Sequence, residues 1–312
     1  MLAAHGLAGA REEPFAHTGF SGAALTRLRR GDGASFVLKR MSIGRDWIMR
    51  ATEDESCREA AFEAASLALP DGVRTPALGV ARDGDGHALL MLDISEHLVP
   101  QGAIDAPTLD AIIARMAELH ATPLPPPDAL RWCGLRQRLT LLTPDTARIA
   151  EAYGAPVARD IIDGWALFER HAPPDVAALI RALSGDPSPL LRALDALPIA
   201  LLHGDLKLDN IGLDSEGRLW LIDWAMTLLA PPAVELGWFL AMNSRRIPRS
   251  LDDVMSRYAA EARIVDRERH DALTVLCGLL LRGWRKALDA EAGEPDELRW
   301  WCDQVREAAR FL

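Results

Sequence analysis

Three polar residues in the second half of the chain have the types and the spacing that phosphoryl transfer requires. Asp205 and Asn210 lie five residues apart in the loop 203–210, which reads HGDLKLDN, and Asp223 follows a short apolar run. Phosphoryl transfer needs little covalent help from a protein, but it needs a carboxylate that orients the attacking hydroxyl and accepts its proton. It also needs hard oxygen ligands that hold Mg²⁺ on the phosphates. Asp205 is suited to the first task, and Asn210 and Asp223 to the second.

Turn formation is the alternative explanation for Asp205 and Asn210, because both residue types are common in turns. That explanation accounts for one residue at a time. It leaves unexplained the two strand-like runs that bracket the loop, 199–202 and 219–222, and the second acid that follows them. We expect a hairpin to return Asp223 to the side of Asn210.

The loop 203–210 and the segment 222–224 (IDW) resemble the aminoglycoside phosphotransferase and choline kinase family, whose members are distant relatives of protein kinases. The resemblance implies that Asp205 is the catalytic base and that Asn210 and Asp223 bind Mg²⁺. It also implies that the chain transfers a phosphoryl group from ATP, with GTP not excluded, to a hydroxyl group of a small molecule.

The N-terminal half carries a further part of the resemblance. Segment 18–22 (TGFSG) is similar to the family's nucleotide-covering loop, in which glycine lets the backbone approach phosphates closely; a plain Gly/Ser turn is the alternative. Segment 36–39 (FVLK) resembles the strand whose lysine reaches the α- and β-phosphates. A solvated lysine at a strand end is the alternative for Lys39. The loop residues expected to bind the nucleotide are Gly19, Ser21 and Gly22.

The family pairs that lysine with a glutamate of the following helix. We expect Glu59 to be the partner of Lys39, because Phe62, three positions later, would anchor the same face of the helix. Glu55 and Glu63 lie one helical turn to either side and remain alternative partners. An ordinary solvated acidic face is a further alternative.

Segment 89–95 (LLMLDIS) resembles the linker whose backbone receives adenine, with Asp93 and Ile94 as the contacts; a buried strand followed by a turn is the alternative. The resemblance therefore implies an α+β, protein-kinase-like fold with two lobes. Residues 1–93 would form a small nucleotide-binding lobe with an antiparallel sheet and one helix. Residues 94–98 would form a hinge, and residues 99–312 a larger, mostly helical lobe that holds the catalytic loop and the acceptor.

Several positions near the catalytic loop bear on how far the family pattern applies. Lys207 matches a lysine of Ser/Thr protein kinases, so it either neutralises the charge of the migrating phosphoryl group or is a surface lysine. Glu235 stands where the family has an aspartate, which puts its support of the loop in doubt. His203 is expected to brace the loop by hydrogen bonds. Gly204 replaces the arginine with which most protein kinases read a phosphorylated activation loop, so regulation of that kind is not expected.

The elements that must position these residues follow from hydrophobic periodicity and turn residues. Strands are expected at 23–30, 35–41, 73–80 and 88–92, with a tight turn at 31–33 between the first two. Segment 52–55 (TEDE) fits a capping box, so a helix is expected from 52 to about 69. Apolar residues recur at helical spacing in 108–120. Further helical patterns occupy 135–152, 157–170, 175–183, 251–263, 268–290 and 295–311.

Composition limits the partners. The formal net charge of −10 over 312 residues argues against nucleic acid, which needs clustered Lys and Arg, and is compatible with a cationic acceptor. No apolar run approaches the ~20 residues of a membrane crossing, and no secretion signal is visible. The four cysteines form no CxxC pair, which fits a reducing cytoplasm. We therefore expect a cytoplasmic enzyme.

The acceptor-binding region carries no recognisable motif, so sugars, amino alcohols and aminoglycosides are all candidate acceptors, and the oligomeric state is left open. Asp209, Glu235 and nearby aromatic residues could form a pocket for a cation, although tryptophans at helical positions are more often part of a core. The aromatic candidates are Trp224, Trp238, Trp284, Trp300 and Trp301. Two other functions remain: a catalytically inactive nucleotide-binding scaffold, which the intact set of acids disfavours, and a protein kinase, which Gly204 disfavours.

Overall fold

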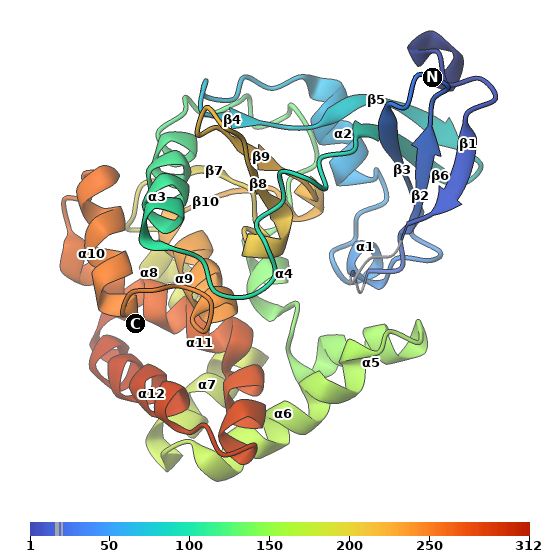
Figure 1. The fold of residues 1–312 in the computed structure, drawn as a ribbon. Helices are drawn as coiled ribbons and strands as arrows, with labels where there is room; N and C mark the ends of the chain where they lie inside the picture. The colour runs from blue at the N-terminus through green and yellow to red at the C-terminus, as the bar shows by residue number, and fades with distance from the viewer. Residues whose placement is uncertain (16–18, 20) are drawn as a thin grey trace.

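The computed structural model describes residues 1–15, 19 and 21–312 of the chain. They form two parts, a small one built on an antiparallel sheet and a larger one that is mostly helical, so the fold is α+β (Figure 1). The sheet lies beside the N-terminus at the upper right of Figure 1, and the C-terminal helices lie at the lower left.

The N-terminal sheet has the strand order β1-β2-β3-β6-β5, with every neighbouring pair antiparallel. Leu38 of the central strand packs with Leu28 and Leu90, while its neighbour Val37 packs with Leu89, so both faces of the strand are buried. The predicted strands 23–30, 35–41 and 88–92 are confirmed, and β1 is an addition. The five strands are β1 (Arg11–Pro14), β2 (Ala24–Arg29), β3 (Ser35–Met41), β5 (Ala77–Asp83) and β6 (Gly86–Leu92).

Two short helices replace the single helix predicted over 52–69, so that prediction is wrong. Asp46 caps α1 (Trp47–Ala51) by accepting hydrogen bonds from two N–H groups of the first turn, at 2.9 and 3.0 Å. Thr52 ends this helix instead of beginning one, and its hydroxyl donates to a carbonyl one turn earlier. Asp54 accepts from the N–H of Arg58 at 2.7 Å and so serves the start of the second helix.

The second helix, α2 (Arg58–Ala65), is attached to the helical part of the molecule. The buried guanidinium of Arg58 donates to the carbonyls of Arg131 at 2.9 Å and Ala225 at 2.6 Å. Phe62 stacks on Trp224, with ring centroids 4.1 Å apart. Because Cys57 and Ala60 also pack with Val37 and Leu89 of the sheet, α2 is held by both parts of the molecule.

The strand predicted at 73–80 is in fact two strands in different sheets. β4 (Val73–Arg74) pairs in parallel with β9 (Leu219–Leu221) of the helical part, whereas β5 starts at Ala77 in the N-terminal sheet. Pro76 lies between them, and a proline has no N–H with which to continue a strand ladder. The chain therefore crosses to the helical part and returns.

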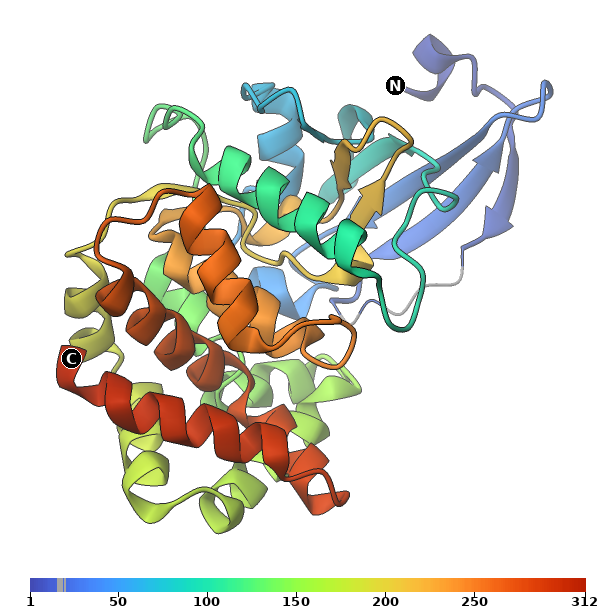
Figure 2. The ribbon, with the colours of Figure 1, turned by 60° about the vertical axis from the view of Figure 1, so that its left-hand side comes forward.

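The long helix α11 organises the helical part by packing against α6, α9 and α12. Figure 2 shows α12 running alongside α11. The predicted helical patterns are confirmed, except that 135–152 is divided before Pro144, and neither α8 nor α9 was among them. Among the described residues, no helix has both the length and the apolar character that crossing a membrane requires. The helices are α3 (Ala106–His120), α4 (Leu135–Thr140), α5 (Pro144–Ala152), α6 (Val157–His171), α7 (Pro174–Gly185), α8 (Ser188–Leu194), α9 (Pro232–Asn243), α10 (Leu251–Glu261), α11 (Arg267–Glu291) and α12 (Asp296–Ala308).

Two short antiparallel ladders carry the loop 203–210. β7 (Ala200–Leu202) pairs with β10 (Leu228–Ala230), and β8 (Ile211–Leu213) pairs with β9. The strands predicted at 199–202 and 219–222 are confirmed, but their partners β8 and β10 were not predicted. The loop runs from β7 to β8 and ends in the 3₁₀-helix η2 (Leu208–Asn210). The segment after β9 leads into a second 3₁₀-helix, η3 (Trp224–Met226).

Candidate active site

A cavity of about 660 Å³ is lined by residues of both parts of the molecule. The sheet part contributes apolar side chains such as Val37 and Met91, and the helical part contributes the loop 203–210 and residues of α4, α9 and α11. Nearly all of the residues expected from the sequence to form the site line this one space. They are Gly19, Ser21, Lys39, Glu59, Asp93, Ile94, Asp205, Lys207, Asn210 and Asp223.

The loop 203–210 folds so that Asp205 becomes the centre of a hydrogen-bond network. Its Oδ2 accepts from Lys207 Nζ at 2.8 Å and from Asn210 Nδ2 at 3.0 Å. Asn210 Nδ2 also donates to the main-chain carbonyl of Asp205 at 2.9 Å. Because both bonds use the amide nitrogen, Oδ1 of Asn210 is turned away from Asp205 and is suited to bind a cation.

Asp223 is brought beside Asn210 by the β8–β9 hairpin, as expected. The N–H of Ile222 donates to the carbonyl of Asn210 at 3.1 Å. Asp223 itself has a φ of +71° and a ψ of +60°, in the left-handed region that few residues other than glycine occupy. Such backbone conformations cluster at functional sites, where the surrounding structure holds them.

Lys39 bridges two carboxylates across the boundary of the two parts. Its Nζ lies 2.6 Å from Glu59 Oε2 and 2.8 Å from Asp223 Oδ1. The pairing predicted for Glu59 is confirmed, since Glu55 is exposed and Glu63 accepts from the hydroxyl of a threonine instead. Burial opposes charge on Lys39, but the two carboxylates outweigh it and raise its pKa, so the lysine stays protonated.

The same ammonium groups act on Asp223. Burial disfavours the ionised form of this carboxyl, but Lys39 and Lys207 outweigh that effect and hold its pKa below the ordinary value. Burial likewise opposes charge on Lys207, and the neighbouring Asp205 and Asp223 raise its pKa. Lys39, Lys207 and Asp223 are therefore charged near neutral pH, so a carboxylate is ready to bind a cation and a cationic lysine lies beside the expected base.

His203 braces the loop and is not placed as a proton carrier. Its Nε2 donates to the carbonyl of Ile222 at 2.9 Å, and its Nδ1 accepts from the N–H of Asp205 at 3.2 Å. Burial lowers the pKa of the imidazole, so it is neutral. Gly204, with a φ of +85°, is needed beside it, because a Cβ there would lie 2.0 Å from the carbonyl oxygen of Met226.

Glu235 supports the loop despite replacing the aspartate of the family pattern. Its Oε1 accepts from the N–H of Gly204 at 2.5 Å, and its Oε2 accepts from the N–H of His203 at 3.3 Å. His120 Nε2 lies 2.8 Å from the same carboxylate, and its Nδ1 lies 2.6 Å from the Tyr258 hydroxyl. The doubt raised by the substitution is removed, and His120 and Tyr258 are supporting residues that the sequence did not indicate.

The linker segment keeps two backbone groups available. Asp93 uses its N–H on the carbonyl of Ser35, and its carboxylate accepts from Arg27 Nε and the Ser35 hydroxyl at 2.8 and 2.7 Å. The carbonyl of Ile94 accepts from His97 N–H at 2.8 Å. Within the described residues, the Asp93 carbonyl and the Ile94 N–H have no main-chain partner. The two groups belong to one trans peptide unit and point in opposite directions, so one of them can face the cavity at a time.

The predicted nucleotide-covering loop is described only in part, since Thr18 and Phe20 lie outside the described residues. Gly19 and Ser21 line the cavity, whereas Gly22 does not. Gly22 has a φ of +104°, and a Cβ on it would lie 2.1 Å from the carbonyl oxygen of Arg45. Its role in this structure is close packing against the segment before α1.

Four further residues of the cavity wall come from the helical part. Trp238 and Trp284 were candidates for a cation pocket, but Arg138 and Arg282 were missed, because arginines on amphipathic helices read as surface residues. The acids proposed for that pocket are already engaged: Asp209 pairs with Arg246 at 2.6 Å, and Glu235 supports the loop. Trp224, Trp300 and Trp301 do not line the cavity.

A family model confirms what the loop and the fold indicate. The chain belongs to the phosphotransferase enzyme family, whose model matches residues 18–273. A solved structure of the GDP complex of aminoglycoside 2′-phosphotransferase-IIIa is 14% identical, with 98% of this chain and 95% of that chain covered and a TM-score of 0.54. Choline kinase LicA from Streptococcus pneumoniae is 14% identical, with 96% and 92% covered and a TM-score of 0.52.

A third similar structure is amicoumacin kinase hAmiN, solved with AMP-PNP, Ca²⁺ and Ami. It is 12% identical, with 95% of this chain and 88% of that chain covered and a TM-score of 0.52. At these identities the likeness shows the fold alone, and it confirms the expected kinase-like α+β architecture. No curated protein matches the chain by sequence.

Proposed function

We propose that the protein is a small-molecule kinase that transfers the γ-phosphoryl group of ATP, with Mg²⁺, to a hydroxyl group of its acceptor. The observation that carries this proposal is the convergence of Asp205, Asn210 and Asp223 on one cavity that also holds the Lys39–Glu59 pair. Membership of the phosphotransferase enzyme family supports the reaction class.

Asp205 is the proposed base. Its carboxylate is held by Lys207 and Asn210, so one oxygen is fixed and the group is oriented toward the cavity. In this role it accepts the proton of the attacking hydroxyl as the new ester bond forms. Lys207 stays charged, which suits it to stabilise negative charge on the transferred group.

The nucleotide is proposed to lie between the sheet and the loop 203–210, with its base against the linker. One of the two free groups of the linker, the Asp93 carbonyl or the Ile94 N–H, would bond to the edge of adenine, and Lys39 would reach the phosphates. Residues 1–93 are then the nucleotide lobe, 94–98 the hinge and 99–312 the catalytic and acceptor lobe. Similar proteins were solved with GDP and with AMP-PNP, so GTP is the alternative donor.

Asn210 and Asp223 are the proposed metal ligands. The amide oxygen of Asn210 and the carboxylate of Asp223 are the hard oxygen donors that Mg²⁺ prefers, and the site leaves room for phosphate oxygens. Among the described residues, no cluster of three or more His, Cys, Asp or Glu side chains could hold a metal alone, which suits a site completed by the nucleotide. When bound, Mg²⁺ neutralises charge on the phosphates.

The test is turnover of Mg²⁺-ATP by the purified protein with a panel of sugars, amino alcohols, aminoglycosides and hydroxy acids. Asp205→Ala should lower kcat by about 10²–10⁴-fold, because only the base is removed. Nucleotide binding, measured as the shift of Tm with Mg²⁺-ATP, should persist. Unchanged turnover in this variant would contradict the assignment, and a Tm shift without ATP consumption on any acceptor would favour an inactive scaffold.

A further inference from the structure

The helical wall of the cavity holds four buried hydrogen-bond donors without acceptors. Arg138 Nη1, Arg282 Nε and the indole nitrogens of Trp238 and Trp284 have no partner in the described part of the chain. All four residues line the cavity. Buried donors without acceptors are uncommon in folded proteins, so four of them on one wall indicate a ligand that supplies acceptor atoms.

The two arginines form no direct ion pair with the described residues, and carboxylates such as Asp205 attract them only from a greater distance. Within the described residues, no carboxylate lies within ion-pair distance of Arg138 or Arg282, although Arg138 is almost fully buried. Burial, with the neighbouring Arg285 adding to it, lowers the pKa of Arg282 to about 10. A buried cation without a partner is unfavourable, and it becomes favourable when an anion enters beside it.

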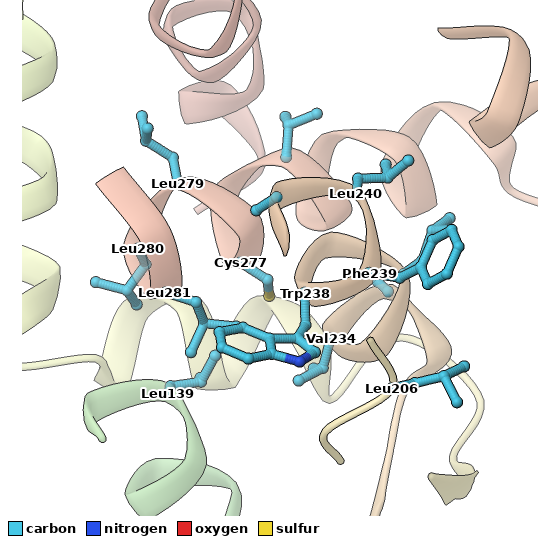
Figure 3. Packing of buried hydrophobic residues seen from close by; sticks show 14 of the residues in the cluster. Leu139, Leu206, Val234, Trp238, Phe239, Leu240, Cys277, Leu279, Leu280 and Leu281 are labelled. Atoms are coloured by element: carbon cyan, nitrogen blue, oxygen red, sulfur yellow. The ribbon is translucent and has the colours of Figure 1, made fainter. Parts of the chain in front are cut away.

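Aromatic rings hold these guanidinium groups in place. The Cζ of Arg138 lies 4.4 Å from the ring centroid of Trp238, and that of Arg282 lies 4.5 Å from the centroid of Trp284. Figure 3 shows the Trp238 indole lying among Leu139, Cys277 and Leu281 of the surrounding helices. Stacking fixes the orientation of a guanidinium but accepts none of its in-plane hydrogen bonds, so the N–H groups that no protein atom accepts remain for a ligand.

This donor wall adjoins the proposed base. Arg138 Nε donates to the carbonyl of Gly204, the residue before Asp205, at 2.6 Å. Its residues come from α4, α9 and α11 of the helical part, whereas Lys39 and the linker belong to the sheet side. The donors are therefore placed beside the attacking hydroxyl and away from the proposed position of the purine.

The negative charges that face this end of the cavity are few. Asp160 of α6 lines it but is exposed, so solvent screens its charge. Arg285, which also lines it, is paired with Asp289 at 3.0 Å. Apart from the base Asp205, the charges that line this end are the buried Arg138 and the partly buried Arg282, both positive. The buried carboxylates of Glu235 and Asp289 attract them from outside the cavity lining.

We propose that the acceptor is anionic: it carries a carboxylate or a phosphate group near the hydroxyl that is phosphorylated, and Arg282 and Arg138 bind that group. The inference rests on the proposed kinase function and narrows its acceptor. It replaces the sequence-based expectation of a cationic acceptor, which the net charge of −10 had suggested. The tryptophan N–H groups would donate to further oxygens of the same molecule.

Acceptors of one carbon skeleton test this directly: a sugar, its amino sugar, its sugar acid and its sugar phosphate, assayed with Mg²⁺-ATP. We expect kcat/KM for an anionic member to exceed that of the neutral sugar at least about 10-fold, with the amino sugar poorest. The sugar acid and the sugar phosphate identify which anion is used. A preference for the neutral or amino sugar would overturn the inference while leaving the kinase function intact.

Single substitutions test whether Arg282 and Trp284 bind the anionic group of the acceptor. Arg282→Met should raise KM for the anionic acceptor about 10- to 100-fold and leave KM for ATP unchanged, as expected for losing a charge-assisted hydrogen bond. Trp284→Phe, which keeps an aromatic ring but removes the N–H donor, should raise KM for the anionic acceptor several-fold. Arg192→Met removes an exposed arginine of α8 and is the matched control. A rise in KM for ATP instead would assign Arg282 to the nucleotide phosphates and overturn the inference.

A binding measurement separates the two proposals. The Tm of the wild-type protein without nucleotide should rise with millimolar sugar acid or sugar phosphate, and the Arg282→Met protein should lose this shift. If no acceptor is phosphorylated but this shift is present, the kinase function fails and the anion site stands. If neither anion produces a shift that depends on Arg282, the anion site is wrong whatever the turnover.

Discussion

The two ends of the cavity satisfy their polar groups in different ways. At the sheet end, Lys39 has two carboxylates, and Asp93 has an arginine and two serines. At the helical end, Arg138 and Arg282 have aromatic faces but no carboxylate among the described residues. The paired end is organised before any ligand arrives. The unpaired end is complementary to a ligand and is complete only when that ligand binds.

The largest effect should come from the paired end. Asp223→Asn removes the charge of the proposed metal ligand and weakens its contact with Lys39, so kcat should fall by about 10²–10³-fold, the size expected when one charge-stabilising group is lost. The Mg²⁺ concentration needed for half-maximal rate should rise as well. Steady-state kinetics over a Mg²⁺ titration measures both, and an unchanged Mg²⁺ dependence would contradict the role of Asp223.

A smaller effect is expected from the other partner of Lys39. Glu59→Gln leaves a buried ammonium with one carboxylate, which should lower the free energy of unfolding by about 1–3 kcal/mol and raise KM for ATP. Denaturant unfolding and kinetics measure the two effects. Glu55→Gln, at an exposed position of the same segment, is the control and should change neither quantity.

The support of the loop should depend on pH. Burial opposes ionisation of Glu235, but hydrogen bonds from His120 and the loop lower its pKa below the ordinary 4.5. Its contribution is therefore complete above pH 4.5 and declines as the pH falls below that value. At pH 7, Glu235→Gln should be less stable than wild type by about 1.5–3 kcal/mol. The difference should shrink in acid, and a difference that grows in acid would contradict this.

Replacing an arginine of the unpaired end should increase the free energy of unfolding, whereas replacing a carboxylate of the paired end should decrease it. Arg282→Met replaces a partly buried charge without a carboxylate in contact by an apolar side chain, so the free energy of unfolding should rise by up to about 1 kcal/mol even as acceptor binding is lost. Arg192→Met should stay within about 0.5 kcal/mol of wild type. If Arg282→Met and Glu59→Gln lowered the free energy of unfolding equally, the proposed contrast between paired and unpaired charges at the two ends of the cavity would be wrong.

The part of the site that could be predicted is the part in which neighbours in sequence are neighbours in space. Asp205 and Asn210 lie in one loop, and a single hairpin adds Asp223, so their types and spacing were sufficient. For the pairing of Lys39, the family resemblance called for a glutamate in the following helix, and the apolar Phe62 selected Glu59 from three candidates. Arg138 and Arg282 come from separate helices, and nothing local distinguishes them from exposed arginines.

The errors in the fold have local causes. The residue types at 52–55 fit a capping box, but Asp46 caps α1 and Asp54 accepts from the first turn of α2. The segment predicted as one helix therefore contains the end of one helix and the start of another. The strand at 73–80 failed because Pro76 divides it and because β4 finds its partner, β9, about 150 residues away, a distance at which periodicity gives no information.

The attachment of α2 has a consequence for how the two parts of the molecule are joined. Arg58 and Phe62 tie this helix to the helical part, whereas Cys57 and Ala60 pack in one apolar cluster with Val37 of the sheet. Lys39 of β3 contacts Glu59 of this helix at 2.6 Å and Asp223 of the helical part at 2.8 Å. A change at α2 therefore acts on the position of the lysine from both parts at once.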